Sequence, residues 1–193
     1  MGADKVRVNL GCGHKVLPGW LNVDMSGPAD VLADIRFWDP PGPCSEVLCV
    51  HVIEHLEWRD AVLLVRRARD WLDGGGRLVV EMPDRLKCLS VGGLEGAKGI
   101  MGGRSKNKAE WADWLAAHQK DILALAKKAQ FEEILSKVPK AFRLPGEAHQ
   151  HVWSASELVD ELERAGFVEV EDVGKPVTHG KRVWRDMRVE ATA

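Results

Sequence analysis

The stretch VRVNLGCGHKVLPGWLNVD, residues 6–24, contains the pattern that decides the fold. Its alternating apolar residues predict a strand that ends at Leu10, and Gly11 and Gly13 follow at once. A second apolar run ends at Asp24. Glycine lets a backbone approach a ligand closely, and an acid at the tip of the next strand can accept hydrogen bonds from both ribose hydroxyls. The stretch therefore predicts a nucleotide-type ligand at the carboxyl edge of a parallel sheet.

A dinucleotide-binding fold is the main rival for this pattern. Its fingerprint requires Gly-x-Gly-x-x-Gly, a helix, and an acid roughly 20 residues further on. Here Val16 stands at the third glycine position, and Pro18 and Gly19 interrupt a connection that is too short for a crossover helix. The connection offers no helix N-terminus to a pyrophosphate, which favours a ligand without phosphate at this point.

Four short motifs follow one another along the first part of the chain: Asn9-Leu-Gly-Cys-Gly13, Pro18-Gly-Trp-Leu-Asn-Val-Asp24, Ala33-Asp34 and His51-Val-Ile-Glu-His-Leu56. With these motifs the chain resembles the class I S-adenosylmethionine-dependent methyltransferases, in particular the small bacterial type-11-like group. The resemblance extends over residues 6–84 and returns at 151–167, but it does not cover residues 86–147. It implies an α/β fold with a Rossmann-like, doubly wound, seven-stranded and mostly parallel sheet whose last strand is antiparallel.

The resemblance also implies a methyl donor, S-adenosyl-L-methionine, and a site for it. The glycine pair would hold the methionine part, Asp24 the ribose hydroxyls, Met25 the adenine face and Asp34 the adenine amino group. The implied donor-site positions are Asn9, Gly11, Cys12, Gly13, Asp24, Met25, Asp34, Ile35 and His51. The alternative for Asp24 is a turn-forming aspartate, and the alternative for Asp34 is a helix cap.

Periodicity places the remaining elements. Strands are predicted at Val6–Leu10, Leu21–Val23, Val31–Ala33, Glu46–Val50, Leu78–Met82 and Phe167–Val173, with an edge strand through Val183, Met187 and Val189. One helix is predicted from about Trp58 to Leu72, before three glycines, and another behind the capping box Ser154-Ala-Ser-Glu157. We expect one domain, residues 1–193, with residues 86–147 as a helical cap insertion over the carboxyl edge of the sheet.

Composition agrees with a globular protein. The net charge of −2 over 193 residues carries no overall signature of nucleic-acid or membrane binding. The first residues lack the apolar core of a signal peptide, and the four cysteines lack Cys-x-x-Cys spacing, which favours free buried thiols. We therefore expect a cytoplasmic protein, either a monomer or a homodimer.

The cap insertion is more basic than the rest of the chain. Between Lys98 and Arg143, ten Lys or Arg residues stand against five Asp or Glu residues. One interpretation is a solvated helix face. The other is a cap that attracts an anionic, phosphate-bearing acceptor such as a nucleotide, a sugar phosphate or, less favoured, a nucleic acid. Trp111 and Trp114 match the spacing of a buried helical stripe, so we expect them in the core.

Methyl transfer from a sulfonium is an in-line displacement that needs alignment, exclusion of water and, for a hydroxyl acceptor, a base. His51 is the best candidate for that base, with lining of the donor pocket as the alternative. His149 and His151 alternate in a segment that we expect to be extended, so both are predicted to enter the acceptor site as further catalytic candidates. Asp84 also faces this site, unless it is a helix cap.

The string His51-Val-Ile-Glu-His55 also matches the His-x-x-Glu-His motif of inverted zinc peptidases, in which two histidines on one helix bind zinc. Here the string directly follows a predicted strand, so we expect no metal. The position also lacks Asn/Asp-Pro-Pro-Tyr/Phe, which the family uses to methylate exocyclic base amines. Two functions stay open: a methyltransferase acting on an oxygen or nitrogen of a small acceptor, including anionic ones of nucleotide or sugar type, and a donor-binding module without catalysis.

Overall fold

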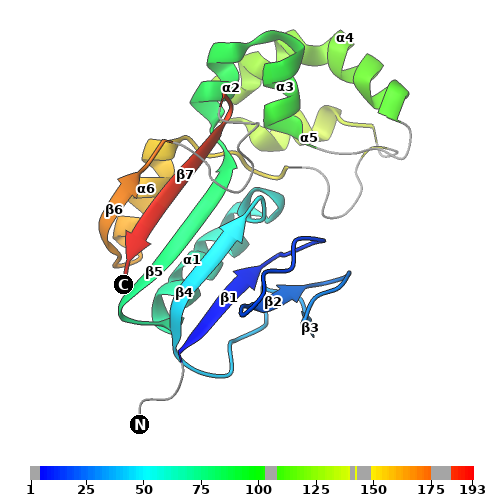
Figure 1. Cartoon of the computed structure of the whole chain (residues 1–193). Coiled ribbons are helices and arrows are strands. Elements are labelled where there is room, and N and C mark those ends of the chain that lie inside the picture. Colours follow the sequence, from blue (N-terminus) through cyan, green and yellow to red (C-terminus); the bar gives the residue numbers. More distant parts are fainter. Residues whose placement is uncertain (1–4, 103–107, 140–141, 143–148, 175–183) are drawn as a thin grey trace.

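The computed structural model describes residues 5–102, 108–139, 142, 149–174 and 184–193. At its centre is a seven-stranded sheet in the order β3-β2-β1-β4-β5-β7-β6 (Figure 1). The strands are β1 (Val6–Leu10), β2 (Leu21–Asp24), β3 (Val31–Leu32), β4 (Cys44–Val50), β5 (Leu72–Pro83), β6 (Val168–Asp172) and β7 (Asp186–Thr192). Strands β1 to β5 pair in parallel, whereas β7 pairs antiparallel with both β5 and β6. The predicted fold class is confirmed.

The helices are η1 (Ile53–His55, a 3-10 turn), α1 (Trp58–Trp71), α2 (Arg85–Val91), α3 (Gly93–Met101), α4 (Lys108–Lys127), α5 (Phe131–Lys137) and α6 (Ala155–Arg164). The predicted capping box opens α6: the Ser154 hydroxyl accepts a hydrogen bond from the Glu157 amide, and the Glu157 carboxylate accepts one from the Ser154 amide. The predicted end of α1 is nearly right, and the three glycines that follow lie within β5, where Gly75 has a left-handed φ of 81°.

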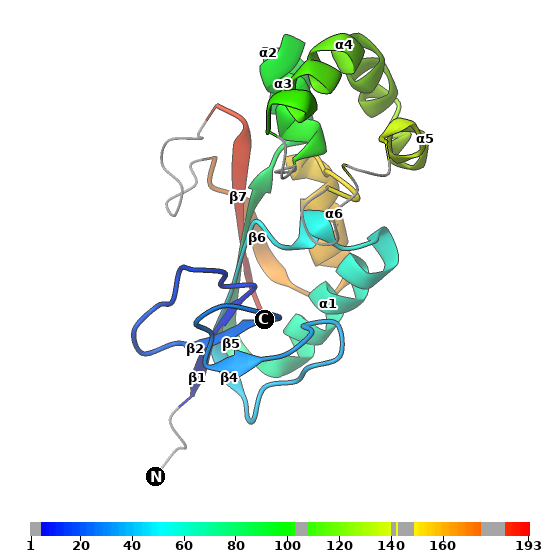
Figure 2. The same cartoon turned by 90° about the vertical axis from the view of Figure 1, so that its right-hand side faces the viewer.

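The main hydrophobic core lies on one face of the sheet. Residues at alternate positions of four strands, such as Val8, Val47, Val80 and Val189, pack there beneath α1 and α6. Figure 2 shows both helices on the same side of the sheet. The connections between β1 and β2, β2 and β3, and β3 and β4 contain no helix, and all of their residues are described. Helices α1 and α6 therefore cover one face of the sheet, and these three connections add no helix to the other face.

The other face of the sheet carries paired charges. Arg77 on β5 contacts Glu46 at 2.6 Å and Glu190 at 2.9 Å. Arg188 on β7 contacts the same Glu190 at 2.6 Å and the fully buried Glu81 at 2.5 Å. Charged side chains at alternate strand positions explain why the described residues form no second apolar core on this face.

A second hydrophobic cluster forms the cap. Helices α2 to α5 lie beyond the carboxyl ends of β4 and β5 (Figure 1), and α2 follows β5 directly. Trp111 is buried in this cluster and stacks on Trp114 at a centroid distance of 5.4 Å, which confirms the prediction that Trp111 is a core residue. Asp84 is the N-cap of α2, because its carboxylate accepts hydrogen bonds from the amides of Leu86 and Lys87.

The four cysteines are free and buried, as predicted. Val183, predicted in the last strand, lies outside the described residues. Among the helices that the structure describes, none combines the length and the apolar character that a bilayer crossing requires.

Candidate active site

The loop after β1 meets the end of β2 through a main-chain hydrogen bond. The φ angles of Gly11 and Gly13 are 59° and 52°, a left-handed conformation that turns the chain sharply at the end of β1. The Gly13 amide donates to Oδ2 of Asp24 at 2.9 Å, and the Ser26 amide donates to Oδ1 at 3.0 Å. Asp24 is the last residue of β2, so its carboxylate lies at the carboxyl edge of the sheet.

The loop between β1 and β2 contains no helix and is held by hydrogen bonds with the side-chain amides of Asn9 and Asn22. Asn9 is buried and donates to the Lys15 carbonyl at 3.0 Å and to Oδ1 of Asn22 at 2.9 Å. Oδ1 of Asn22 also accepts from the Leu17 amide at 2.8 Å, and Nδ2 of Asn22 donates to Asp30 at 2.8 Å. Asn9 therefore positions the loop, and its contact with the donor remains a prediction.

The two glycines of the loop have different surroundings. A Cβ at Gly11 would lie 2.4 Å from Cγ2 of Val52, so the protein itself occupies that space. A Cβ at Gly13 would meet no heavy atom within 4 Å. Cys12, between them, is buried, and burial together with the charge of Asp24 raises the pKa of its thiol. Gly11 thus allows Val52 to pack closely against the loop, whereas Gly13 borders open space. Contacts of Gly11, Cys12 and Gly13 with the donor remain predictions.

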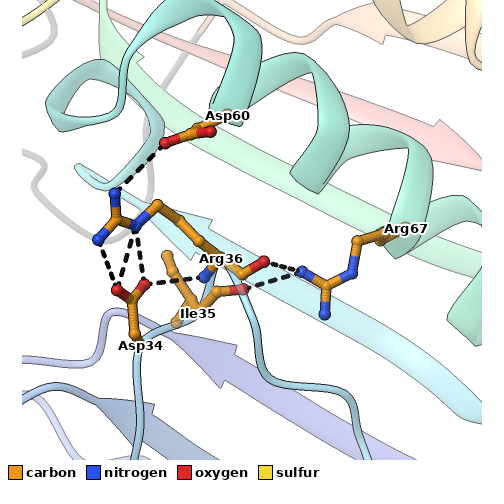
Figure 3. Close-up of polar contacts among 5 residues, drawn as sticks. All are labelled: Asp34, Ile35, Arg36, Asp60 and Arg67. Carbon is orange, nitrogen blue, oxygen red and sulfur yellow. Dashed lines mark hydrogen bonds and ion pairs between the residues drawn. The ribbon is translucent and has the colours of Figure 1, made fainter.

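The segment after β3 is tied to α1 (Figure 3). Both carboxylate oxygens of Asp34 accept hydrogen bonds from Arg36, the shortest at 2.6 Å, and Arg36 also lies 3.4 Å from Asp60. Hydrogen bonds from Arg36 hold the pKa of Asp34 below its usual range. Arg67 donates to the carbonyl of the buried Ile35 at 3.3 Å. An adenine contact by Asp34, which the sequence predicts, would have to share the carboxylate with Arg36.

Met25, predicted to cover the adenine face, is 70% exposed and so presents its side chain at the surface beside Asp24. Its exposed thioether is accessible to a planar ligand. The contact itself remains a prediction.

His51 lies directly after β4 and is held between two buried carboxylates. Its Nδ1 is 3.0 Å from Oε1 of Glu54, and its Nε2 is 3.2 Å from Oδ2 of Asp186, an ion pair without aligned hydrogen-bond geometry. Burial alone would lower the pKa of His51, but the contacts with Asp186 and Glu54 raise it to about 9. For Glu54, burial would raise the pKa, but the hydrogen bond from His51 lowers it to about 2.

The His51 backbone is also strained, with φ at 55°, a conformation that is costly for a residue with a side chain. The surrounding contacts, including the 2.7 Å hydrogen bond from the His51 amide to the Glu81 carbonyl, hold it there. In this arrangement His51 is protonated near neutral pH and cannot accept a proton from a methyl acceptor. Its role as general base stays a prediction, one that requires the contacts to Glu54 and Asp186 to open.

His55 and His149 come together beside Glu54. Their ring centroids are 5.0 Å apart. Nδ1 of His149 lies 3.1 Å from the Gly99 carbonyl, and the Gln150 amide donates to the Glu54 carbonyl at 2.7 Å. Burial lowers the pKa of His149 to about 3, so its ring is neutral at physiological pH.

His151 contacts a different group of side chains. Its ring centroid is 5.0 Å from that of Trp58 and 4.6 Å from that of Phe131. Burial lowers its pKa to about 4. His149 and His151 thus contact different groups of side chains, which differs from the shared direction predicted for them. Their entry into an acceptor site remains a prediction.

A groove of about 920 Å³ lies beside His151, between the start of α1 and the region of α5. Its lining includes Glu57, Trp58, Arg59, Phe131, Gln150 and His151. Trp58 and His151 also line a second, smaller pocket together with Trp153 and Glu157. Aromatic rings in a groove next to the cap form a surface that suits a flat, partly apolar ligand.

No protein-family model matches this chain, and no curated protein sequence matches it. Solved structures do. The S-adenosylmethionine-dependent methyltransferase SibL aligns over 98% of this chain, with 17% identity and a TM-score of 0.52. An S-adenosylmethionine-dependent methyltransferase from Mesorhizobium loti aligns over 97% of this chain and 90% of its own length, with 16% identity and a TM-score of 0.51. The chain has the class I methyltransferase fold.

A third solved structure with this fold is the 1,6-didemethyltoxoflavin-N1-methyltransferase of Burkholderia thailandensis, which aligns over 97% of this chain and 71% of its own length, with 13% identity and a TM-score of 0.52. This chain spans about half the length of SibL. Within the class I methyltransferase fold, Gly13 and Asp24 lie at the carboxyl ends of two adjacent strands, and His51 lies at the carboxyl end of β4.

Two residues of the site were missed by the sequence interpretation. Asn22 stands between apolar residues of β2, and a polar residue in that position signals a buried amide with specific partners. Asp186 was missed because its partner, His51, is distant in the sequence and no local motif joins the two. Asp186 is fully buried at the start of β7, so the antiparallel strand supplies one wall of the site.

Proposed function

We propose that the protein is an S-adenosylmethionine-dependent methyltransferase that moves a methyl group to an oxygen or nitrogen of a small acceptor. One observation carries the proposal: the Gly13 amide and the Asp24 carboxylate are joined at the carboxyl ends of β1 and β2 within a class I methyltransferase fold. In open α/β sheets, ligands bind in the crevice outside the carboxyl ends of the strands. Asp24 would bind the ribose hydroxyls there, and the loop carrying Gly13 would border the methionine part.

The solved structures support the choice of donor. The Burkholderia thailandensis enzyme was solved with bound 1,6-didemethyltoxoflavin and S-adenosylhomocysteine. PigF, with 11% identity and a TM-score of 0.50, was solved with S-adenosylhomocysteine. These complexes belong to those proteins, and they support the same donor here through the shared fold.

The groove at Trp58, Phe131 and His151 is the proposed acceptor site. Its aromatic rings would hold a flat acceptor by stacking, and Gln150 and the charged groups of Glu57 and Arg59 would set its orientation. In the reaction, the acceptor atom forms a bond to the methyl carbon as the carbon–sulfur bond breaks, and the electron pair of that bond goes to sulfur. The protein mainly has to align the two partners and exclude water.

A donor-binding module without turnover is the second candidate. The observation that favours it is the enclosure of His51 between Glu54 and Asp186, which removes the predicted base from action. An amine acceptor needs no strong base, so methyl transfer to nitrogen is compatible with the same enclosure.

Isothermal titration calorimetry with S-adenosylmethionine and S-adenosylhomocysteine tests the proposal. We expect saturable binding of both, and release of S-adenosylhomocysteine when a library of small aromatic and phosphate-bearing acceptors is added. Binding without product formation would select the silent module, and absence of binding would contradict both candidates. Salt dependence separates the acceptor classes, because a nucleic acid would bind more weakly as salt rises, whereas a neutral metabolite would not.

A further inference from the structure

Three segments that are distant in the sequence meet near the carboxyl end of β4. They are η1, the end of α3 and the segment 149–151, which returns from the cap. Main-chain hydrogen bonds fix them to one another: the His149 amide donates to the Met101 carbonyl at 3.1 Å, and the Gln150 amide donates to the Glu54 carbonyl at 2.7 Å. The side chains of Glu54, His55 and His149 are thereby held in one cluster.

We propose that Glu54, His55 and His149 form a binding site for one divalent transition-metal ion. Each residue offers one ligand atom, and these atoms lie within 4.8 Å of one another. Modest side-chain rotation closes such a set to metal–ligand bonds of about 2.0–2.2 Å. Two imidazoles and one carboxylate are a donor set that suits Zn²⁺ and Mn²⁺, and three protein ligands leave a coordination position open for another ligand.

Polar atoms without partners support the proposal. Glu54 is 1% exposed, yet its Oε2 has no hydrogen-bond partner among the described residues. Nδ1 of His55 is also buried and has no hydrogen-bond partner within the part of the chain that the structure describes. Buried polar atoms are nearly always satisfied, so two orphaned atoms in neighbouring residues call for a ligand that is missing from the chain itself. A cation would satisfy both.

The outer contacts of the cluster are those that orient metal ligands. Nδ1 of His149 donates to the Gly99 carbonyl at 3.1 Å, which leaves Nε2 as the ring nitrogen with the lone pair. Oε1 of Glu54 accepts from His51 at 3.0 Å, which leaves Oε2 for the metal. Backbone carbonyls and hydrogen-bonded side chains in such positions fix the tautomer and direction of ligating groups.

The backbone also makes room for this arrangement. A Cβ at Gly102 would lie 2.3 Å from Nε2 and from Cδ2 of His149. The φ angle of Gly102 is 56°, so both conformation and space require glycine at the end of α3. The inference replaces the expectation of no metal, and the ligand set differs from the zinc-peptidase interpretation because His51 takes an outer position and His149 takes its place.

A metal in this position would supply what the enclosed His51 does not. This part rests on the proposed function. Held by Glu54, His55 and His149, a divalent ion would lower the pKa of an acceptor hydroxyl that reached its open coordination position, and that hydroxyl would give its proton to water before transfer. The resulting oxygen then bonds to the methyl carbon as the carbon–sulfur bond breaks, and sulfur becomes a neutral thioether. The metal site thus favours an oxygen acceptor over a nitrogen acceptor.

Metal binding can be measured without any turnover. The chain, prepared without a histidine tag, is treated with EDTA, desalted and titrated with ZnCl₂ or MnCl₂ in a calorimeter and with CoCl₂ under visible absorption. We expect one equivalent of metal per chain, with a Co²⁺ spectrum of nitrogen and oxygen ligands. Absence of saturable binding for all three ions would overturn the proposal.

Variants locate the site. His55→Gln and His149→Gln should each weaken Zn²⁺ binding by more than about 100-fold. Loss of a residue that only orients a metal ligand costs up to about 100-fold, so a larger loss identifies a direct ligand. His118→Gln is the matched control, because His118 lies on α4 and hydrogen-bonds the Trp114 carbonyl outside the cluster. Unchanged affinity in both cluster variants would overturn the assignment.

Folding is checked with the unfolding temperature in EDTA and the circular dichroism spectrum. His55 is only half-buried, so His55→Gln should stay folded even if the buried His149→Gln does not. Zn²⁺ should raise the unfolding temperature of the parent chain and of His118→Gln, but not that of His55→Gln. A rise in His55→Gln equal to that of the parent would contradict the site.

The donor titration separates this proposal from the proposed function. S-adenosylhomocysteine binding that persists in EDTA, together with loss of metal binding in the cluster variants, would support both proposals. Metal binding without donor binding would leave the metal site in place and remove the methyltransferase. Donor binding without metal binding would leave the proposed function in place and remove the metal site.

Discussion

The Gly13 amide donates a hydrogen bond of 2.9 Å to Oδ2 of Asp24, and this bond joins the ends of two adjacent parallel strands. It sets the direction of the carboxylate before any ligand arrives. A second amide, that of Ser26, binds the other oxygen at 3.0 Å. The carboxylate is therefore fixed at the sheet edge, with further lone pairs on each oxygen available to a ribose.

Asp24→Ala should weaken donor binding by about 1–3 kcal/mol, which is the range for loss of a charged hydrogen-bond partner. Asp24→Asn is the matched variant, because it keeps the shape and one acceptor oxygen but removes the charge. We expect an intermediate loss for Asn in calorimetric titration with S-adenosylhomocysteine. Equal affinity in all three proteins would remove Asp24 from the donor site.

Gly11→Ala and Gly13→Ala form a pair that separates packing from ligand access. Both residues have left-handed φ, so each substitution should cost about 1 kcal/mol of unfolding free energy from conformation alone. In Gly11→Ala the new Cβ would also lie 2.4 Å from Cγ2 of Val52. This overlap should lower the unfolding free energy by a further amount of about 1–3 kcal/mol.

Gly13→Ala should be the more stable of the two variants, but it should bind the donor more weakly than Gly11→Ala does. Gly13→Ala places a methyl in the open space beside Asp24, where the donor is proposed to lie, and should weaken donor binding more than it weakens the fold. Urea denaturation and calorimetry measure the two quantities. If Gly13→Ala were the less stable protein, the steric argument would be wrong.

Arg188→Leu should destabilise the protein by about 3–5 kcal/mol, because it breaks the 2.5 Å ion pair with the fully buried Glu81. The double variant Arg188→Leu with Glu81→Leu should recover much of that loss, since both charges are then gone. Arg77→Leu is the control on the same face: Arg77 is about half-exposed, and its loss should cost less than about 1 kcal/mol. Chemical denaturation of the four proteins gives the comparison.

The capping box of α6 should make stability depend on pH. Burial tends to raise the pKa of Glu157, but hydrogen bonds from Arg85 and from Ser154 outweigh it and lower that pKa. A carboxyl whose pKa is lower in the folded protein stabilises the fold above its unfolded pKa, about 4.3, and loses this contribution as pH falls through the folded pKa.

The unfolding free energy of the parent chain should therefore exceed that of Glu157→Gln near neutral pH, and the difference should shrink below about pH 4. Glu163→Gln serves as the control, because Glu163 is exposed on the same helix. A difference that stays constant across this range would show that the Glu157 charge does not act through the cap. Ser154→Ala should separately cost about 1 kcal/mol through loss of the cap itself.

Much of the sheet and of the donor edge can be predicted from the sequence because the signals are local. The apolar alternation around Val8 and Val23 defines β1 and β2, and the position of Asp24 at the end of β2 follows from chain order alone. The end of α1 can be predicted for the same reason. Gly74 to Gly76 follow the helix as predicted, and they lie in β5, where Gly75 adopts a left-handed φ of 81° that glycine permits.

The surroundings of His51 and His149 could not be predicted because they depend on contacts between distant segments. His149 meets His55 only through the path of the chain around the cap, and Asp186 meets His51 only through the antiparallel pairing of β7. The one-sided layer arrangement did have a signal. Charged residues at alternate positions of β5 and β7, such as Arg77, Glu81 and Arg188, are incompatible with a second apolar face.

The two faces of the sheet should respond differently to ionic strength. Screening weakens interactions between partly exposed charges such as Arg77, Glu46 and Glu190, but it leaves the apolar packing beneath α1 and α6 almost unchanged. Added salt should therefore weaken the ion pairs on the charged face of the sheet more than the apolar packing on the other face. Strand β5 carries Arg77, and β7 carries both Glu190 and Asp186, so these two strands are the part of the molecule through which salinity would reach the contact between His51 and Asp186.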